Sequence, residues 1–410
     1  MQSNKEIFLA ILDNYIHPDH RLPEIKNLQV EDIEELFRLA SEHSVFPVIY
    51  EQVRQTKAYQ DLPNERKQYD KMKIKRLVIG QTCRTNLFLM LYKELLNLEI
   101  PMLVVKGLVC RNMYSNPDYR QSCDEDILIR KEDFHKLDQA LEQRGFLREQ
   151  IDHPEKEHEI TFYNEAKGLY LEVHLSLFPE ESGAYGRLNR EFEDVFESYV
   201  IEKIQGVDIY TLDPTKHMLY LLCHGLKHFL HSGFGIRQLC DMVLFAEKYG
   251  DRIDWKQIEI STRRQHMELF WLNLFDIGEN YLGFSWKKAN LKKPKKIKLD
   301  SEAMLSDLLD SGVYGKSSEE RVHSANITLE AVQSSKKRVS IRRSLFPSME
   351  YMKMRYPYLK RHGWMLPYAW LERVFDYLKQ NDRQEAMATV EMGKTRTELL
   401  RKYGIIDRQD

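Results

Sequence analysis

The sequence predicts an α+β fold in which a mixed β-sheet core is flanked by N-terminal and C-terminal helical regions. Apolar residues recur at helical spacing over about residues 3–98, and helical patterns return after Pro214. Between these two regions, short apolar runs alternate with amphipathic segments, which is typical of strands and helices that pack together around one sheet.

The composition is that of an ordinary globular protein. The chain has 410 residues and 42% apolar side chains, and its net charge of -2 does not favour nucleic acid or a membrane surface as a partner. Five scattered cysteines without a Cys-x-x-Cys pair suggest reduced thiols, so we expect a cytoplasmic protein. The most apolar window, residues 87–105, contains Lys93, Glu94 and Glu99, and this excludes it as a membrane span.

The first region, residues 1–99, is expected to hold three to five helices. A second region, residues 100–212, is expected to form the sheet. Its first strand is the apolar run 100–105, which Gly107 closes. The following pattern predicts a short helix at 108–114, a strand at 122–129, a helix at 131–144 ended by Gly145, strands at 159–163 and 168–177, and another strand at 207–212.

The third region, residues 213–286, is predicted to be helical and to complete a cleft. Pro214 suits the first turn of a helix that extends to about residue 232, and further helices are expected at 236–249 and 255–282. Residues 287–410 are predicted to be a basic linker and a C-terminal extension. This part begins with seven lysines in 287–298 and includes a basic run at 336–343 and an aromatic segment at 356–370.

Acidic residues on two predicted strands suggest a metal site. In a strand, Asp124 and Asp126 would point to the same face with their backbones roughly 7 Å apart. On a neighbouring strand, Glu172 and His174 share the face opposite to the apolar side chains and could lie beside the pair. Three carboxylates together require a cation, and Mg²⁺ is the usual partner of such oxygen donors.

A bend that could bind an anion precedes the aspartates. Lys106 and Gly107 stand between a predicted strand and a helix start, where backbone N–H groups favour a phosphate and glycine allows its close approach. Lys106 and Arg120 could add positive charge to a triphosphate. Two metal ions could then activate an attacking hydroxyl group and bind the leaving phosphates.

Simpler interpretations exist for each of these residues. With 63 acidic residues in the chain, roughly ten acidic-x-acidic pairs are expected by chance. Lys106 could be an exposed turn lysine, and Glu172 with His174 could be a solvated strand face. The functional hypothesis depends on the order of the segments, in which a strand, the Lys-Gly pair, a helix, the carboxylate strand and a hairpin with a third carboxylate follow one another.

This order resembles the polymerase beta-like nucleotidyltransferase superfamily, and more specifically a group of uncharacterised nucleotidyltransferases. The residues that carry the resemblance lie within about 100–260: Lys106-Gly107, Tyr114, Pro117, Tyr119, Arg120, Asp124, Asp126, Glu172, His174 and the helical stretches HGLKHFLH and IRQLCDM. The resemblance implies a nucleotidyltransferase-like mixed sheet and transfer of a nucleoside monophosphate from an NTP to a hydroxyl acceptor, a small molecule or a protein.

The resemblance also implies roles for individual residues. It implies that Asp124, Asp126 and Glu172 are catalytic and bind Mg²⁺ or Mn²⁺. The residues implied in nucleotide binding are Lys106, Gly107, Arg120, His174, Lys227 and Arg237.

The motif departs from the superfamily pattern in its spacing, because sixteen residues separate Gly107 from Asp124, and also at two positions. Lys106-Gly107 replaces the usual Gly-Ser or Gly-Gly, and Glu125 replaces an apolar residue between the aspartates. A catalytically degenerate binding or regulatory protein of the same fold therefore remains the alternative.

A different class of enzyme is suggested by three histidines on one predicted helix. His224, His228 and His231 have the spacing i, i+4 and i+7, which could present imidazoles to a metal ion in a helical phosphohydrolase. The sequence has no adjacent His-Asp pair, and Asp241 is the only nearby carboxylate. Polar residues that line a cleft, together with Lys227, Arg237 and Asp241, are the favoured interpretation.

Overall fold

The computed structural model describes the greater part of the chain: residues 3–22, 25, 28–180, 182, 184–231, 233–312, 332, 349, 352, 356, 358–372 and 383–406. Within these ranges, every helix is too short or too polar to span a bilayer.

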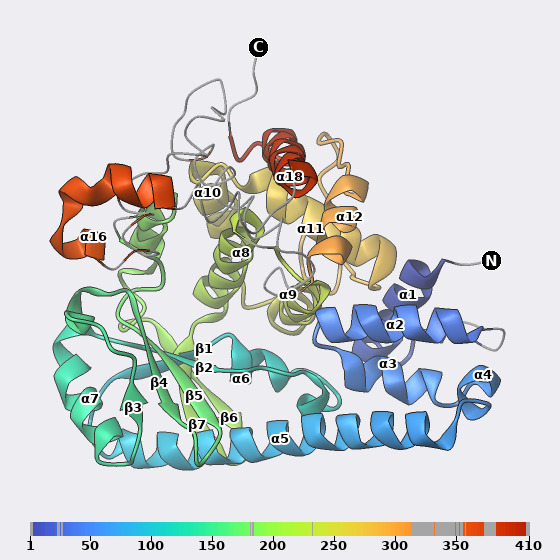
Figure 1. Ribbon diagram of the computed structural model, residues 1–410, viewed down its shortest axis with the longest axis horizontal. Helices are drawn as coiled ribbons and strands as arrows, with labels where there is room; N and C mark the ends of the chain where they lie inside the picture. The colour runs from blue at the N-terminus through green and yellow to red at the C-terminus, as the bar shows by residue number, and fades with distance from the viewer. Residues whose placement is uncertain are drawn as a thin grey trace.

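Five helices precede the sheet, as predicted. They are α1 (Asn4–Ile16), α2 (Val30–Glu42), α3 (Phe46–Val53), α4 (Lys57–Gln60) and α5 (Asn64–Leu96). The long helix α5 runs along one edge of the molecule, beneath both the sheet and the other N-terminal helices (Figure 1). Its buried residues include Phe88 and Tyr92, and the Tyr92 hydroxyl group donates to the carbonyl oxygen of Met102 at 3.1 Å. Helix α5 therefore attaches the N-terminal region to the first strand.

The predicted mixed sheet is confirmed. Its strands are β1 (Met102–Val105), β2 (Glu125–Ile129), β3 (Leu147–Arg148), β4 (Glu159–Asn164) and β5 (Leu169–His174), in the order β1-β2-β5-β4-β3. The pair β2 and β5 is parallel, and the other pairs are antiparallel. All residues of β1 and β2 are buried, which agrees with the apolar sequence of β1 and of Ile127 to Ile129 in β2. The neighbouring strands β2 and β5 carry Asp126 and Glu172.

Two helices connect the first strands. Helix α6 (Gly107–Arg111) is shorter than the predicted segment 108–114, and α7 (Phe134–Glu142) follows the 3-10 turn η2 (Lys131–Asp133). The chain leaves α7 at Gly145, whose φ of 78° favours glycine, so the predicted helix end is confirmed.

The strand predicted for 122–129 begins later, at Glu125. The segment before it is held by side chains of α5: Gln81 accepts a hydrogen bond from the Ser122 N–H at 2.9 Å, and Arg84 donates to the Ser122 carbonyl oxygen. These contacts take the place of the strand ladder, so Asp124 lies just outside β2.

The strand predicted for 207–212 exists but does not join the mixed sheet. It is β7 (Val207–Leu212), and it pairs with β6 (Tyr199–Ile204), which the sequence analysis missed, in a separate two-stranded sheet. Gln205 and Gly206 form the turn between them with φ values of 48° and 80°, which is the geometry of a tight hairpin.

Helices α8 (Pro214–Leu230) and α9 (Ile236–Tyr249) match the predicted segments and pack beside each other over the sheet region (Figure 1). The helix predicted for 255–282 is two helices, α10 (Trp255–Arg264) and α11 (Glu268–Tyr281), because the chain turns at His266, where φ is 57°. Helix α12 (Glu302–Ser311) follows, after the lysine-rich segment 287–298, which contains no helix or strand.

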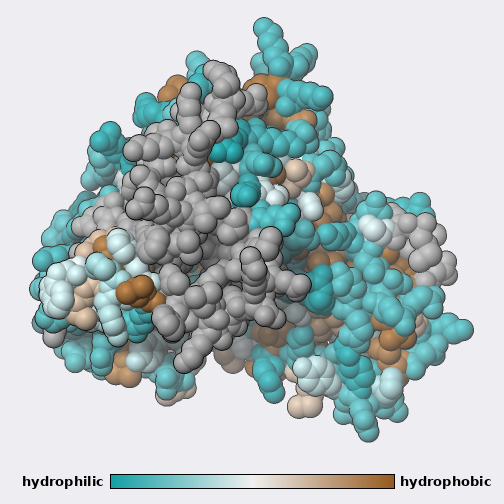
Figure 2. Space-filling view, turned by 45° about the horizontal axis from the view of Figure 1, so that its top comes forward, coloured by the Kyte–Doolittle hydropathy of each residue, from teal (hydrophilic) through white to brown (hydrophobic). Residues whose placement is uncertain are grey.

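The C-terminal extension contributes α16 (Tyr358–Arg361) and α18 (Arg383–Lys402), while the basic run 336–343 lies outside the described residues. The remaining short helices are the 3-10 turns η1 (Pro117–Tyr119), η3 (Pro154–Lys156), η4 (Gly186–Phe192) and η6 (Gly363–Met365). In the described part of the face in Figure 2, hydrophilic residues predominate and apolar ones form small separate patches.

Candidate functional site

Lys106 stands at a sharp bend between β1 and α6. Its φ of 53° and ψ of -95° form a backbone conformation that is costly for any residue with a side chain. The Lys106 N–H donates to Nε2 of His217 at 3.1 Å, and Nδ1 of His217 lies 3.3 Å from the Thr211 hydroxyl oxygen. Burial lowers the pKa of His217 to about 3, so the ring is neutral and accepts the N–H of the bend. The strained bend therefore has a dedicated support.

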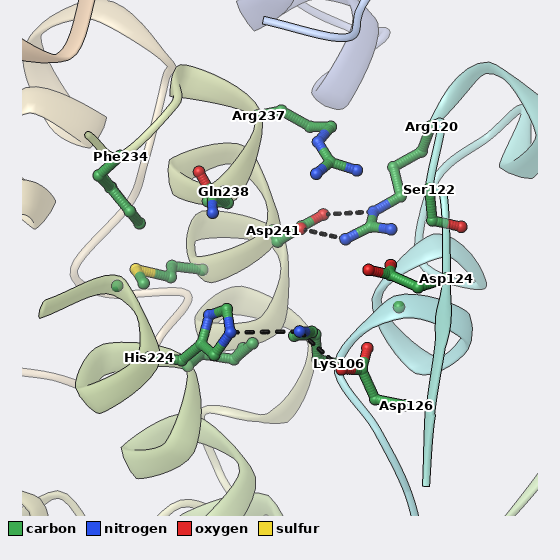
Figure 3. A pocket seen from close by; sticks show the side chains of 14 residues that line it. Lys106, Arg120, Ser122, Asp124, Asp126, His224, Phe234, Arg237, Gln238 and Asp241 are labelled. Atoms are coloured by element: carbon green, nitrogen blue, oxygen red, sulfur yellow. Dashed lines mark hydrogen bonds and ion pairs between the residues drawn. The ribbon is translucent and has the colours of Figure 1, made fainter. Parts of the chain in front are cut away.

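The bend aims the Lys106 side chain at the sheet. Its Nζ lies 2.7 Å from Oδ1 of Asp126 and 3.2 Å from Nε2 of His224 on α8 (Figure 3). Helix α6 has only five residues, so its dipole contributes less than the sequence analysis assumed. The positive charge at this place comes chiefly from the ammonium group.

Asp126 and Glu172 are direct neighbours on the parallel strands β2 and β5. Together with His174 they form a group whose donor atoms all lie within 4.8 Å of one another. Asp126 is completely buried, and its Oδ1 lies 3.2 Å from Nε2 of His174, while its Oδ2 has no hydrogen-bond partner. A buried carboxylate oxygen without a protein partner is costly, and a water molecule or a cation would satisfy it.

The two carboxyl groups have opposite pKa shifts. Burial raises the pKa of Asp126, but the charge of Lys106 and the hydrogen bond from His174 outweigh it, so the net shift is downward. Burial and the negative charge of Asp126 raise the pKa of Glu172 to about 10. Without a cation, Asp126 is therefore ionised and Glu172 is protonated at neutral pH. A divalent ion would reverse the state of Glu172 because it favours both carboxylates.

Asp124 lies apart from this group. It lines a cleft with Asp126, Lys106 and Gly107, but it does not belong to the cluster of three donors. Its role as a metal ligand stays a prediction.

Glu125, between the two aspartates, has a buried arginine as its partner. Its Oε1 lies 3.5 Å from Nη2 of Arg111, and both side chains are almost completely buried. Burial raises the pKa of Glu125, although the Arg111 charge opposes this shift. The unusual acidic residue between the aspartates thus belongs to a buried ion pair with Arg111.

The far wall of the cleft contains a buried fork. Nε and Nη2 of Arg120 donate to the two carboxylate oxygens of Asp241 at 3.1 and 2.7 Å, and the Tyr114 hydroxyl group donates to Asp241 Oδ1 at 2.7 Å (Figure 3). Arg237 does not pair with Asp241 but donates to the carbonyl oxygen of Gln121. The fork fixes the position of Arg120, whose contact with a nucleotide stays a prediction.

The cleft between β2, α8 and α9 encloses about 450 Å³ of space, part of it open to solvent. Among its lining residues are Lys106, Gly107, Arg120, Asp124, Asp126 and Arg237 from the predicted set, together with His224, Gln238 and Asp241. Phosphate groups entering it would meet Lys106, Arg120 and Arg237, which stand among the carboxylates of Asp124, Asp126 and Asp241.

Three predicted residues lie beside the cleft rather than in its lining: Glu172, His174 and Lys227. His174 Nδ1 is 3.6 Å from Oε2 of Glu159, and Lys227 Nζ is 4.0 Å from the same oxygen. Glu159, which the sequence analysis did not select, therefore connects them. Its position opposite His174 on β4 follows from strand register, which the sequence alone did not fix.

The three histidines of α8 do not form a metal site of their own. Nε2 of His224 lies 3.2 Å from Nε2 of His228, and His231 stacks on Tyr185. Burial lowers the pKa of His224 and His228 well below the usual value. None of the three belongs to a possible metal-binding group of the described residues, so the structure does not support the phosphohydrolase hypothesis.

A family model described as uncharacterised nucleotidyltransferase matches residues 29–283, which is more than half of the chain. The chain belongs to this family. No match was found among curated proteins or among solved structures.

In this member of the nucleotidyltransferase family, the matched region contains both sides of the candidate site. It includes Lys106, at the bend after β1, and Asp241 on α9. It also includes α2 to α5 and extends to the end of α11. Helix α1 lies before the matched residues, and the segment that begins with the lysine-rich stretch lies after them.

Proposed function

We propose that this protein transfers a nucleoside monophosphate from an NTP to a hydroxyl-bearing acceptor, a small molecule or a protein. Asp124, Asp126 and Glu172 would hold Mg²⁺ or Mn²⁺. The observation that supports this proposal most directly is the in-register pair of Asp126 and Glu172 at the edge of a cleft that also contains Lys106.

The residues fit a hard divalent cation. Asp126 has a buried oxygen without a hydrogen-bond partner, and Glu172 is driven to bind a proton because burial and the charge of Asp126 outweigh the opposing charge of Lys106. His174 supports the orientation of Asp126 through its 3.2 Å contact. When bound, the metal would lower the pKa of the acceptor hydroxyl group and stabilise the charge of the phosphates.

Gly107 preserves space in front of the carboxylates. A Cβ atom at this position would lie 3.5 Å from Oε2 of Glu125 and 3.9 Å from the unpartnered Oδ2 of Asp126. Glycine therefore leaves room for a phosphate or a metal ligand next to that oxygen.

Lys106 and Arg237 would bind the phosphates. Lys106 contacts Asp126 in the absence of nucleotide, and its flexible ammonium group could instead donate to a phosphate oxygen in the cleft. Arg237 stands on α9, across the cleft from the aspartates, and Arg120 lies on the segment before β2, where the buried fork with Asp241 fixes it in place. Lys227 would add positive charge beside Glu159, on the sheet side of the site.

Titration calorimetry with ATP or GTP, with and without Mg²⁺, tests the proposal. We expect metal-dependent binding in the wild type and a decrease of roughly 100-fold or more in the affinity of Asp124→Ala with Asp126→Ala. Glu132→Gln, a change at an exposed residue of η2, is the control. No metal-dependent binding in the wild type, or equal binding in the double variant, would contradict the proposal.

Incubation with labelled NTPs and a cell extract would then reveal the acceptor. Transfer of label from the α-phosphate position identifies nucleotidyl transfer, and the labelled product gives the acceptor class.

The alternative is a binding or regulatory protein of the same fold. The specific observation in its favour is the 2.7 Å ion pair between Lys106 and Asp126, which neutralises one of the carboxylates that a metal would need. This alternative predicts NTP binding that does not depend on Mg²⁺, together with no transfer of label in any extract.

A further inference from the structure

A second cluster of metal donors lies at the C-terminal end of α1, outside the matched family region. Asp13 belongs to the last turn of this helix, His17 is its C-cap, and His20 follows in the next bend. Oδ1 of Asp13 lies 3.2 Å from Nδ1 of His17 and 2.8 Å from Nδ1 of His20. Pro18 prevents the helix from continuing. The chain therefore turns back and places His20 next to Asp13.

The spacing of these donors is close to that of a tetrahedral metal site. With metal bonds of 2.0–2.2 Å, two ligands of a zinc ion lie about 3.3 Å apart. The three donor atoms here all lie within 4.8 Å of one another. Two imidazole nitrogens and one carboxylate oxygen favour zinc or a related transition metal over Mg²⁺ or Ca²⁺. The C-terminal end of a helix also favours a cation.

The other ring nitrogen of His17 has the partner that a metal-binding histidine needs. Its Nε2 lies 3.2 Å from Oε2 of Glu247 on α9. Glu247 is fixed in turn, because its Oε1 accepts the Ser285 N–H at 2.7 Å. A carboxylate in this position keeps the proton on Nε2 and directs the lone pair of Nδ1 toward the metal.

The backbone around the cluster is built for close approach. Gly283 has a φ of 66°, and a Cβ atom there would collide with Asp13 Oδ1 and with the ring of His20. The side-chain amide of Asn14 donates to the His20 carbonyl oxygen at 2.5 Å, which fixes the bend that carries this histidine. The cluster thus joins α1, α9 and the turn after α11.

We propose that Asp13, His17 and His20 bind a zinc-type transition metal ion, with Glu247 as the partner of His17. Binding replaces the proton on Nδ1 of His17 or His20 where one is present and releases it to solvent. The ion has a structural role: it fastens the end of α1 to the bend at His20 and, through His17 and Glu247, to α9, the helix that carries Arg237 and Asp241 of the candidate site.

A contact between α1 and the cleft wall connects the proposed metal site to the candidate functional site. The Tyr15 hydroxyl group donates to the Asn116 carbonyl oxygen at 2.8 Å, and its ring stacks on Tyr114 at a centroid distance of 5.6 Å. Tyr114 in turn donates to Asp241. Loosening α1 would therefore disturb the support of the Arg120–Asp241 fork.

The test measures zinc binding by the full-length, untagged protein after treatment with a chelator. The measurements use a protein that carries Glu172→Gln, because this change weakens metal binding at the other candidate group. Competition with a chromophoric chelator then measures the zinc affinity of the α1 cluster. We expect one equivalent of Zn²⁺ with submicromolar affinity, and Co²⁺ to give the visible absorption bands of a four-coordinate site. His20→Ala should lower the zinc affinity by roughly 100-fold, and Glu247→Gln by about 10–100-fold.

His153→Ala is the matched control, because His153 is an exposed histidine next to a carboxylate, Glu155. The side chain of His20 is partly exposed, so His20→Ala should fold, and circular dichroism checks this. Zn²⁺ should raise the Tm of the parent protein and of the control but not that of His20→Ala. Absence of micromolar zinc binding, or the same affinity in His20→Ala, would show that the three side chains form hydrogen-bonded ion pairs only and would overturn the proposal.

Discussion

Glu172 has a stability cost that its proposed function would explain. Its carboxyl group is partly buried beside the ionised Asp126, and burial and this charge raise its pKa to about 10. A free glutamate ionises near pH 4.3, so the unfolded chain loses a proton that the folded protein keeps. The stability contributed by this group is therefore complete at low pH and decreases as the pH rises from about 4 toward 10.

Glu172→Gln should therefore stabilise the protein while it weakens metal binding. In the presence of a chelator at pH 8, we expect its free energy of unfolding to increase by roughly 1–3 kcal/mol, because the amide does not have to take up a proton when the chain folds. Urea unfolding measures this difference. The exposed Glu132→Gln change should stay within about 0.5 kcal/mol of the wild type. A lower stability of Glu172→Gln would mean that the carboxyl group forms a favourable interaction in the metal-free protein.

The pairing of Asp126 with Glu172 was accessible from the sequence, because alternation along two strands gives the face of each side chain. The position of Asp124 outside β2 could not be predicted from the sequence. Gln81 and Arg84 on α5 hold the segment before β2, and no local pattern indicates contacts between such distant residues. The buried fork between Arg120 and Asp241 is of the same kind, since it depends on the packing of α9 against η1.

Among the elements, α8 supports Lys106 of the candidate site. It carries His217, which holds the Lys106 bend, and His224, which contacts the Lys106 ammonium group. Asp213 caps the helix by accepting the N–H groups of Thr215 and Lys216 at 2.9 and 3.2 Å. The start of α8 and the position of the bend are thus linked.

Asp213→Ala should lower the free energy of unfolding by about 1 kcal/mol, because two N–H groups lose their acceptor at the helix start. Asp213→Asn should have a much smaller effect, since its amide oxygen can accept the same hydrogen bonds. Chemical denaturation of both variants makes the comparison. Equal losses in the two variants would assign the effect to the charge of Asp213, which also faces Ser198, rather than to capping.

Elements with a strong apolar pattern were predicted well, and weakly patterned ones were not. Strand β6 has mostly exposed or half-buried residues, and β3 has only two residues, so neither gives a clear signal. The single helix predicted for 255–282 has continuous apolar spacing across the break. The turn at His266 requires a positive φ, and the sequence has no glycine at this position that would indicate the turn.

At the scale of the whole molecule, His43 connects three distant elements. Its Nδ1 accepts the Ile236 N–H of α9 at 3.3 Å, so its Nε2 carries the proton and donates to the Leu309 carbonyl oxygen of α12 at 3.2 Å. The ring is completely buried at the end of α2. Protonation would set two N–H groups against each other, and burial lowers the pKa of His43 to about 4.

Acid should therefore weaken this connection. The unfolded histidine binds a proton near pH 6.5, whereas the folded one resists until about pH 4, so the stability contribution is complete above pH 6.5 and decreases as the pH falls. Between pH 7 and pH 5 the loss from this residue is about 2 kcal/mol. Urea unfolding at both pH values should show that this loss is smaller by that amount in His43→Gln than in the wild type. The exposed His153→Ala variant should keep the wild-type difference; an unchanged pH dependence in His43→Gln would contradict the assignment.

The parallel pairing of β2 with β5 determines when the site can exist at all. Helix α7 and strands β3 and β4 lie between the two strands in the sequence, so Asp126 and Glu172 meet only when distant parts of the chain have come together. Partly synthesised or misfolded chains thus offer no paired carboxylates to a cation. The nucleotide and metal ion of the proposed function would therefore bind only to chains in which β2 and β5 have paired. Bound ligand would then indicate a correctly folded protein and would stabilise it against unfolding.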